Sequence, residues 1–533
     1  MPEHQMAPEK EKDVLIRMVS GARRIADALK GYIGDVRVIS HHDADGITSA
    51  AIICKALARE GKGFHLSFIK QLYEEDIDAL SKEEGGLIVF LDLGSGQLDL
   101  IQDRLISEGK RVIVADHHQI QGEIVSDSLM HLNPTEFGIE ENISGSGTAY
   151  LIARAMSPEN KELSELAVIG AIGDSQMGSI GPHWGLIGLN KEILKDAENA
   201  GKIKVSKGLR IWGRTTRPIH KALEYSVDPY IPGISNSESG AVHFLQEIGV
   251  NLRDENGEWK TLSTLTKDEM EKLTTGIIKE RVRDNHENPH WIFGDVYDLL
   301  DKNGIKDANE FATILNSAGK QNMGHVGVAL CLNDKEYFTM IDEMLNKYRR
   351  EIGKSLRWLE KNMGNVRRTE NANYVLAGSK IPENVVSNVV SIAHRSRFLP
   401  DSEKDKPLFA FVDSDRGETK ISARLSDDAV EKGLSLQEVI SKAASVVGGQ
   451  GGGHAGAAGA SIPKGEEERF INSIEEILKK VSENQNEETG TTEGINDGRE
   501  EGEAGREEAG EKAEGQEGVQ EAERKGLVRY FGA

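Results

Sequence analysis

The chain has 533 residues, a formal net charge of −23 at pH 7 and only two cysteines. This length exceeds what one hydrophobic core supports, so we expect two or three domains. No apolar run is long enough for a membrane span, and residues 1–14 lack the apolar core of a secretory signal. Both cysteines, Cys54 and Cys331, stand in apolar surroundings without a metal-binding spacing, so we expect buried thiols in a cytoplasmic protein.

Charge does not exclude a nucleic-acid partner. Residues 481–533 contain 15 Asp/Glu against 6 Lys/Arg, so about 9 of the 23 net negative charges belong to this terminal segment. A basic groove can exist on an acidic protein, and global charge therefore decides little.

Residues 1–194 are predicted to form an α/β domain. An amphipathic helix is expected over 13–32, followed by three short, mainly apolar runs at 36–40, 87–91 and 111–115. Such runs are typical of strands buried on both faces of a parallel sheet. The helical patterns at 47–58 and 99–108 would supply the crossovers that parallel strands require.

Each of the three runs ends in acidic or imidazole side chains, and a fourth acid follows the apolar stretch 167–173. Ligand sites in open α/β sheets lie at the carboxyl ends of the strands, so these side chains should converge in one cleft. Crowded carboxylates repel one another unless a cation holds them, and carboxylates mixed with imidazoles suit Mn²⁺. The pattern predicts a two-metal phosphoester-cleaving site built from Asp43, Asp45, Asp92, Asp116, His117, His118 and Asp174.

Each motif also has a simpler interpretation. The sequence HHDADG (41–46) could form a turn or a helix N-cap, because Asp is common there. A calcium-binding loop is excluded, because its twelfth position would be Ile52 where a glutamate is required. Asp92 and Asp174 are weak signals alone, whereas two adjacent histidines behind a buried strand rarely serve packing.

The sequence in the middle of the chain predicts a separate, mainly helical inserted module over 195–332, with helices at 237–247 and 307–318. A long helix is expected over 333–363, and residues 333–364 would connect the inserted module to the domain that follows. Its basic residues could form a solvated face or one wall of a nucleic-acid groove. They are Lys347, Arg349, Arg350, Lys354, Arg357 and Lys361.

A second α/β domain is predicted over 365–481. Strands are expected at 373–379, 408–415 and 419–426, then a helix over 435–446, a glycine cluster over 448–461 and a closing helix over 466–481. The glycines could close on a phosphate through backbone N–H groups or could serve a helix–helix crossing. Residues 482–523 are nearly without apolar side chains, so we expect disorder there, before an apolar peptide at the end.

These motifs resemble a known family. HxDxDG, LDLGSG, DHH and GDSQ, in this order, are similar to the four motifs of the DHH phosphoesterase superfamily, and GGGHAGAAGA resembles the glycine-rich motif of its DHH-associated domain. The resemblance extends over about 35–475 and is greatest to RecJ-like nucleases, particularly the archaeal GINS-associated nucleases. Segments 208–235 and 307–334 resemble parts of the inserted module of that subgroup.

The resemblance implies two Mn²⁺ or Mg²⁺ ions and a role for each motif residue. One ion would be held by His41, Asp43 and Asp92, and the other by Asp45, Asp92, His117 and Asp174, with Asp92 shared. His118 would contact the scissile phosphate or protonate the leaving oxygen, and Asp116 would orient a histidine. The residues implied to contact the substrate strand are Ser422, Arg424, Gly452, Gly453 and His454.

Two further segments suggest partners. Arg210, Arg214, Arg217 and Lys221 accompany Trp212, which suits single-strand binding or an ordinary surface loop. Leu527, Tyr530 and Phe531 have the spacing of a sliding-clamp (PCNA) peptide on a long tether, or form a terminal strand that docks on the chain itself. By resemblance, the inserted module would dock the GINS component of the replication fork.

The resulting expectation is a cytoplasmic, metal-dependent exonuclease that hydrolyses single-stranded DNA to nucleoside monophosphates in replication or repair, with RNA left open. Two alternatives stay open. One is a small-substrate phosphoesterase that acts on oligoribonucleotides or cyclic dinucleotides. The other is a replication-fork scaffold without catalysis, against which the full set of carboxylates and imidazoles argues.

Overall fold

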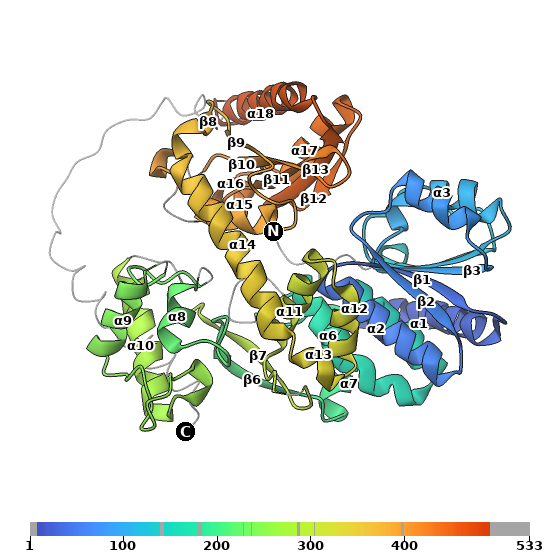
Figure 1. Ribbon diagram of the computed structural model, residues 1–533, viewed down its shortest axis with the longest axis horizontal. Helices are drawn as coiled ribbons and strands as arrows, with labels where there is room; N and C mark the ends of the chain where they lie inside the picture. Colours follow the sequence, from blue (N-terminus) through green and yellow to red (C-terminus); the bar gives the residue numbers. More distant parts are fainter. Residues whose placement is uncertain are drawn as a thin grey trace, which may run out of the picture. The chain divides into compact units, whose positions relative to one another are not determined.

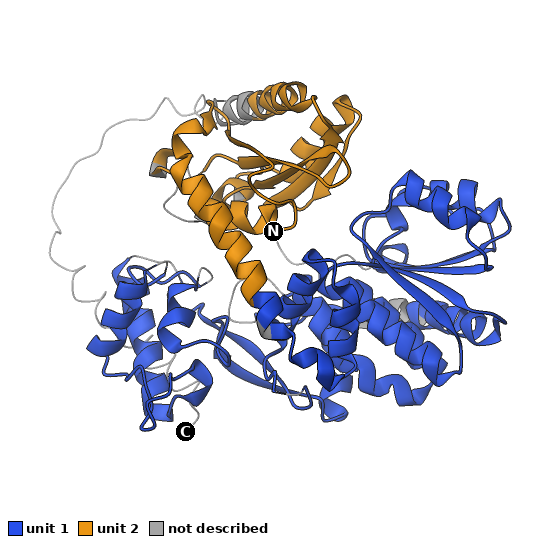
Figure 2. Ribbon diagram, viewed as in Figure 1, with its two compact units in different colours: residues 1–345 blue, residues 346–533 orange. Residues whose placement is uncertain are grey.

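The computed structural model of the chain describes residues 8–138, 143–177, 184–226, 229–235, 237–284, 288–302, 304–395, 399–403 and 405–490. The chain divides into two compact units, Met1–Leu345 and Asn346–Ala533 (Figure 2), and each is described by itself. In the part of the chain that the structure describes, no helix is long and apolar enough to cross a membrane.

Unit 1 contains a parallel five-stranded sheet with the order β2-β1-β3-β4-β5 (Figure 1). The three predicted strands are confirmed as β1, β3 and β4. Leu91 of β3 pairs with Ser40 of β1 on one side and with Ala115 of β4 on the other, so these strands end level at one edge. The strands are β1 (Val36–His41), β2 (Phe64–Ile69), β3 (Leu87–Leu91), β4 (Arg111–Ala115) and β5 (Leu129–Leu132).

Helices cover both faces of this sheet. Alternate side chains of a strand point to opposite faces, so Val89 joins the core with α1, α2, α5 and α6, and Phe90 joins the core with α3 and α4. A π-helical turn, Gln102–Ile106, continues α4, so the helix expected over 99–108 is present in two parts. The bounds are α1 (Pro8–Gly31), α2 (Ala44–Arg59), α3 (Glu74–Lys82), α4 (Leu98–Ile101), α5 (Gly145–Met156) and α6 (Ser164–Gly173).

The apolar stretch before Asp174, which was expected to end at the sheet edge in the manner of the three strands, is a helix. Helix α6 is buried along its length, and an apolar run of that kind cannot be told from a buried strand by periodicity. Gly170 allows the close packing, because a Cβ there would lie 2.1 Å from Ser146 Oγ and 2.5 Å from Asp45 Oδ1.

The inserted region is mainly helical, as predicted, and α9 and α11 are the two helices expected there. The sequence interpretation missed an antiparallel ribbon of β6 and β7, which pairs Ile203 with Leu299 and Leu209 with Phe293. The elements are α7 (Gly188–Asn199), β6 (Ile203–Leu209), α8 (Ile219–Glu224), α9 (Glu238–Glu247), α10 (Lys267–Arg283), β7 (Phe293–Leu299), α11 (Ala308–Lys320) and α12 (Gly324–Cys331).

The helical pattern expected over 333–363 is divided in two. A short helix, α13 (Lys335–Phe338), ends before α14 (Ile341–Lys361) begins. Unit 2 includes α14 from Asn346 onward. The amphipathic periodicity was therefore right for α14 and too long at its N-terminal end.

Unit 2 contains a mixed six-stranded sheet with the order β12-β13-β11-β10-β9-β8. Strands β9 and β10 pair in parallel, and the other pairs are antiparallel. The three predicted strands are confirmed as β9, β10 and β11. The elements are β8 (Arg367–Arg368), β9 (Asn373–Gly378), α15 (Val386–Arg395), β10 (Leu408–Asp413), β11 (Glu418–Arg424), α16 (Asp427–Glu431), α17 (Leu436–Val446), β12 (Gln450–Gly453), β13 (Ala457–Pro463) and α18 (Glu467–Gly490).

The glycine cluster forms the antiparallel strands β12 and β13, so its interpretation as a helix–helix crossing was wrong. Small residues are needed because α17 packs closely on β12: a Cβ on Gly451 would lie 2.8 Å from Ile440 Cγ2. The closing helix α18 extends to Gly490, into the segment for which disorder was expected. Residues 491–533, including Leu527, Tyr530 and Phe531, lie outside the described residues.

Candidate metal centre

Side chains from four places in unit 1 meet at the carboxyl edge of the parallel sheet. They follow β1, β3 and β4, and one caps the C-terminal end of α6. Three sets offer ligand atoms that all lie within 4.8 Å of one another. The sets are His41, Asp43 and Asp92; Asp45, His117 and Asp174; and Asp92, Asp116, His117 and His118.

The first set gathers around His41. Its Nδ1 lies 3.1 Å from Asp43 Oδ2 and 3.3 Å from Asp92 Oδ2. Asp43 is also the N-cap of α2, because its Oδ1 accepts a hydrogen bond from the Gly46 backbone N–H at 3.0 Å. The cap interpretation of HHDADG is therefore right and compatible with a ligand role, since the other oxygen faces the cluster.

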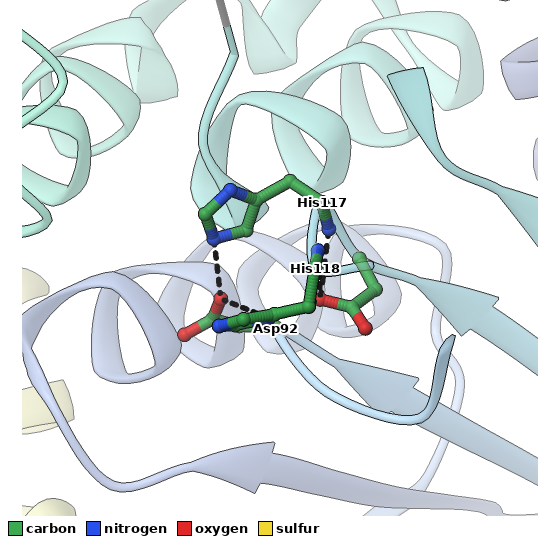
Figure 3. Close-up of side chains that lie close together, drawn as sticks. Asp92, His117 and His118 are labelled. Atoms are coloured by element: carbon green, nitrogen blue, oxygen red, sulfur yellow. Dashed lines mark hydrogen bonds and ion pairs between the residues drawn. The ribbon is translucent and has the colours of Figure 1, made fainter. Parts of the chain in front are cut away.

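The second set gathers around His117. Its Nε2 lies 3.3 Å from Asp92 Oδ1, 3.5 Å from Asp174 Oδ2 and 3.8 Å from Asp45 Oδ2. Asp92 thus presents one carboxylate oxygen to His41 and the other to His117. Figure 3 shows Asp92 beside His117 and His118. A shared carboxylate of this kind suits two neighbouring cations.

The backbone holds the two central carboxylates in place. Asp45 is buried, and its oxygens accept hydrogen bonds from the Gly145 and Ser146 backbone N–H groups at 2.6 and 3.0 Å, at the start of α5. Asp92 has a left-handed backbone with φ 58°, which is uncommon for residues other than glycine. Such strained positions persist where the surrounding structure fixes them, and they cluster at functional sites.

Asp116 orients His118. Its Oδ1 accepts hydrogen bonds from His118 Nδ1 at 2.7 Å and from the His117 and His118 backbone N–H groups, and its Oδ2 accepts one from Ser95 N. Burial opposes the Asp116 charge, but His118 and these hydrogen bonds lower the pKa of Asp116. Asp116 in turn raises the pKa of His118 to about 9. The His118 side chain is 53% exposed, so it can reach a bound molecule.

The remaining side chains shift one another's pKa in the manner of crowded anions. Burial and the neighbouring Asp92 raise the pKa of both Asp45 and Asp174. Burial disfavours the charge of His117, yet the surrounding carboxylates raise its pKa to about 10. Carboxylates that resist ionisation and an imidazole that holds its proton indicate a place for a cation.

The donor set fits a divalent metal. Two buried atoms, Asp92 Oδ1 and His117 Nε2, lie 3.3 Å apart but make no hydrogen bond with each other or with another residue that the structure describes. Buried polar atoms are nearly always satisfied, and each such exception needs an explanation. A cation held by carboxylate oxygens and imidazole nitrogens would satisfy both atoms, and this mixture of ligands is found with Mn²⁺ and related ions.

One supporting residue was missed from the sequence. Asn316 of α11 accepts a hydrogen bond at its Oδ1 from the Ala44 backbone N–H at 2.9 Å, at the start of α2. One turn later, a Cβ on Gly319 would lie 1.6 Å from the His42 carbonyl oxygen, so α11 packs directly on the loop that carries the ligands. The local signal was a polar residue followed by a glycine in an apolar helix, which is too common to be diagnostic.

The residues expected to contact substrate lie in unit 2. Ser422 on β11 pairs with Gly459 on β13, and Gly459 pairs with Gly452 on β12, so the three form one row across the sheet. Arg424 donates hydrogen bonds from Nε to Ser391 Oγ at 2.7 Å and from Nη1 to Ser422 Oγ at 3.4 Å. Gly452, Gly453 and His454 are exposed at the β12–β13 end of the sheet.

The cations around Trp212 are engaged within unit 1. Arg214 pairs with Asp298 and Asp307, and Lys221 pairs with Glu224 and Glu238. Arg217 stacks on the Trp212 ring, with its guanidinium carbon 3.8 Å from the ring centroid. These contacts favour the surface-loop interpretation of this segment over single-strand binding.

Three family models match the chain: the DHH family N-terminal domain over 35–173, the DHH-CID domain over 211–290 and the DHHA1 domain over 371–480. An uncharacterized protein of Methanocaldococcus jannaschii is 30% identical over 465 residues, which cover 86% of this chain and 96% of that protein. The single-stranded-DNA-specific exonuclease RecJ of Thermus thermophilus is 29% identical over 202 residues, which cover 36% of this chain and 28% of RecJ.

Solved structures share the fold. RecJ of Thermus thermophilus in complex with Mn²⁺ matches with a TM-score of 0.52 at 18% identity, over 86% of this chain and 55% of RecJ. CDC45 of Entamoeba histolytica matches with a TM-score of 0.55 at 9% identity, over 88% of this chain and 99% of CDC45. The chain therefore spans about half of the RecJ structure. It belongs to the DHH superfamily, whose hydrolases are metal-dependent phosphoesterases, and is a RecJ-like member of it.

Proposed function

We propose that the chain is a divalent-metal-dependent exonuclease that hydrolyses single-stranded DNA to nucleoside monophosphates in the cytoplasm, in replication or repair. The observation that carries this proposal is the position of Asp92 at the carboxyl edge of the sheet, where one of its oxygens faces His41 of the first ligand set and the other faces His117 of the second. The match to a curated single-strand-specific exonuclease supports the choice of substrate.

Each residue of the metal centre has a proposed role in metal binding or in catalysis. His41, Asp43 and Asp92 would hold one Mn²⁺ or Mg²⁺ ion, and Asp45, Asp92, His117 and Asp174 the other. When bound, two such ions polarise a phosphodiester and lower the pKa of an attacking water. His118, oriented by Asp116, would contact the scissile phosphate or protonate the leaving oxygen.

The other proposed roles rest on the same family likeness. Residues 1–194 would be the catalytic domain and 365–481 the substrate-binding domain, in which Ser422, Arg424, Gly452, Gly453 and His454 contact the strand. Residues 195–332 would dock the GINS component of the replication fork. The peptide with Leu527, Tyr530 and Phe531 would bind a PCNA-type sliding clamp.

Product analysis tests the proposed activity. Single-stranded DNA and RNA, labelled at the 5′ or 3′ end, are incubated with Mn²⁺ and either the parent or Asp43→Asn/Asp45→Asn. We expect progressive release of mononucleotides that the double variant abolishes without loss of folding. Cleavage of dinucleotides but not of long strands would instead assign a small-substrate phosphoesterase. Undiminished activity in the double variant would refute the metal assignment.

A further inference from the structure

Helix α14 carries five exposed basic side chains along one face, Lys347, Arg350, Lys354, Arg357 and Lys361, which we call the cationic stripe. Their spacing of three and four residues keeps them neighbours on the surface of an α-helix. All five belong to unit 2. From the first to the last, the stripe rises through fourteen residues, about 21 Å at 1.5 Å per residue.

The opposite face of α14 fixes the helix to its unit. Tyr348 and Leu359 are buried in a hydrophobic cluster, and Ile352 and Leu356 pack against it. At about 100° per residue, these apolar positions lie on the other side of the helix from the stripe. The stripe therefore faces solvent on a helix whose orientation is set by packing.

The sixth basic residue, Arg349, does not belong to the stripe. It is exposed like its neighbour Arg350 but lies about 100° away from it around the helix axis. The two arginines therefore match in type, exposure and sequence neighbourhood and differ in the face that they occupy.

The stripe is not neutralised by ion pairs, although Glu351 of the same helix stands four residues after Lys347 and three before Lys354. None of its five side chains makes an ion pair or hydrogen bond with the residues that the structure describes, whereas Arg214 and Lys221 of unit 1 are paired. Like charges three and four residues apart destabilise a helix. Five of them in register are therefore unfavourable for α14 itself, and a bound anion would relieve the repulsion.

The geometry favours a phosphodiester backbone as that anion. Neighbours in the stripe stand about 5–6 Å apart, so the stripe offers regularly repeated positive charge to a polymer with one negative charge per nucleotide. Trp358 is half-buried: part of its ring packs against the hydrophobic cluster that holds α14, and part stays at the surface near Lys354 and Lys361. A ring beside a row of cations is typical of surfaces that bind single strands by charge and base stacking.

We propose that the cationic stripe of α14 binds the phosphodiester backbone of a single-stranded nucleic acid. This inference rests on the proposed function and names the surface that takes the strand. It concerns the affinity and salt dependence of binding, and no group of the metal centre takes part in it.

The test compares Arg350→Gln/Arg357→Gln with the parent and with Arg349→Gln as the matched control, all as full chains. Binding of a labelled (dT)20 is measured by fluorescence anisotropy in EDTA over a series of KCl concentrations. Each phosphate contact contributes about −0.7 to the slope of log K against log salt for single strands. We expect the double variant to bind more weakly with a slope shallower by about 1.4, and the control to keep the parental slope.

Three accompanying measurements separate the outcomes. The melting temperature of the double variant should equal or exceed that of the parent, because repulsion is relieved. Mn²⁺-dependent hydrolysis of a dinucleotide should be unchanged, since a dinucleotide is too short to span the stripe. A 20-residue polyglutamate should compete poorly with (dT)20.

An unchanged slope in the double variant, or an equal change in the control, would overturn the proposal. Polyglutamate binding as tight as that of (dT)20 would overturn it in favour of an acidic protein segment. A parent that does not bind (dT)20 yet hydrolyses the dinucleotide would overturn the stripe assignment and leave the phosphoesterase chemistry standing. A parent that binds (dT)20 and hydrolyses nothing would overturn the proposed exonuclease and leave the stripe standing.

Discussion

Asp92→Asn should remove both metal sites at once. Asp92 faces His41 with one oxygen and His117 with the other, whereas Asp43 and Asp174 each belong to one set. Asparagine tolerates the left-handed backbone that Asp92 adopts, so the substitution removes charge without forcing the chain to move. We therefore expect two bound Mn²⁺ in the parent, one in Asp43→Asn or Asp174→Asn, and none in Asp92→Asn.

The magnitude follows from binding linkage. A ligand at 100 times its dissociation constant stabilises the folded state by about 2.7 kcal/mol per site. Two sites give about 5.4 kcal/mol, which falls to about 2.7 kcal/mol in the single-set variants and to about zero in Asp92→Asn. Isothermal titration gives the stoichiometry, and calorimetric melting with Mn²⁺ and with EDTA gives the stabilisation.

The control is the protein in EDTA. The charge of Asp92 raises the pKa of Asp45 and Asp174, which means that it repels them. Removing this charge should leave the EDTA-treated variant at least as stable as the EDTA-treated parent. Two Mn²⁺ bound to Asp92→Asn, or the loss of both ions in Asp174→Asn, would refute the shared-carboxylate arrangement.

The other predictions concern support, proton transfer and pH. Asn316→Ala should weaken Mn²⁺ binding about tenfold, because it removes a hydrogen bond that supports the loop of the metal ligands. Asn316→Asp keeps the acceptor oxygen and should keep the affinity for Mn²⁺. An equal loss of affinity in Asn309→Ala, on the same helix, would contradict this prediction. His118→Ala should lower the cleavage rate by a factor of about 10²–10⁴ while both metal ions stay bound, and Asp116→Asn should lower the cleavage rate by a smaller factor. Loss of a metal ion in either variant would show that the substituted residue is a metal ligand. In EDTA, the pKa of His117 is raised to about 10, above its value in the unfolded chain, so the protonated imidazole stabilises the folded state at pH 6 and this stabilisation is lost as the pH rises through 10. Binding of Mn²⁺ must displace the proton of His117. Calorimetric titrations with Mn²⁺ in buffers of different ionisation enthalpy should therefore record the release of a proton at pH 7–8.

The sequence predicted those parts of the fold that depend on neighbours in the chain. Strands β1, β3 and β4 are short, mainly apolar runs, and each is followed by the acids or histidines of its own loop. Because parallel strands end at one edge, three local patterns were enough to place these side chains together. The convergence followed from topology and needed no knowledge of contacts between distant residues.

The missed features depend on partners that are remote in the sequence. Strand β6 pairs with β7 across the three helices α8, α9 and α10, and neither strand has a sequence pattern that identifies its partner. The hydrogen bond between Asn316 and Ala44 joins residues 272 positions apart. Propensity and periodicity carry no information about such contacts, which arise only when the helices have packed.

Asp174 shows how a correct expectation about a residue can rest on a wrong element. Its carboxylate was placed at the sheet edge as if it followed a strand, yet it caps α6, which packs beside the sheet and ends at the same edge. A helix end can supply a ligand there because α6 is held by α2 and α5, with Gly170 removing the side chain that would collide with Asp45. The position of this carboxylate therefore depends on packing within unit 1, so Gly170→Ala should disturb Mn²⁺ binding although Gly170 offers no ligand atom. The change should act on the set of Asp45, His117 and Asp174 and leave the set around His41 able to bind one ion. Titration of this variant to a stoichiometry of two would contradict the argument.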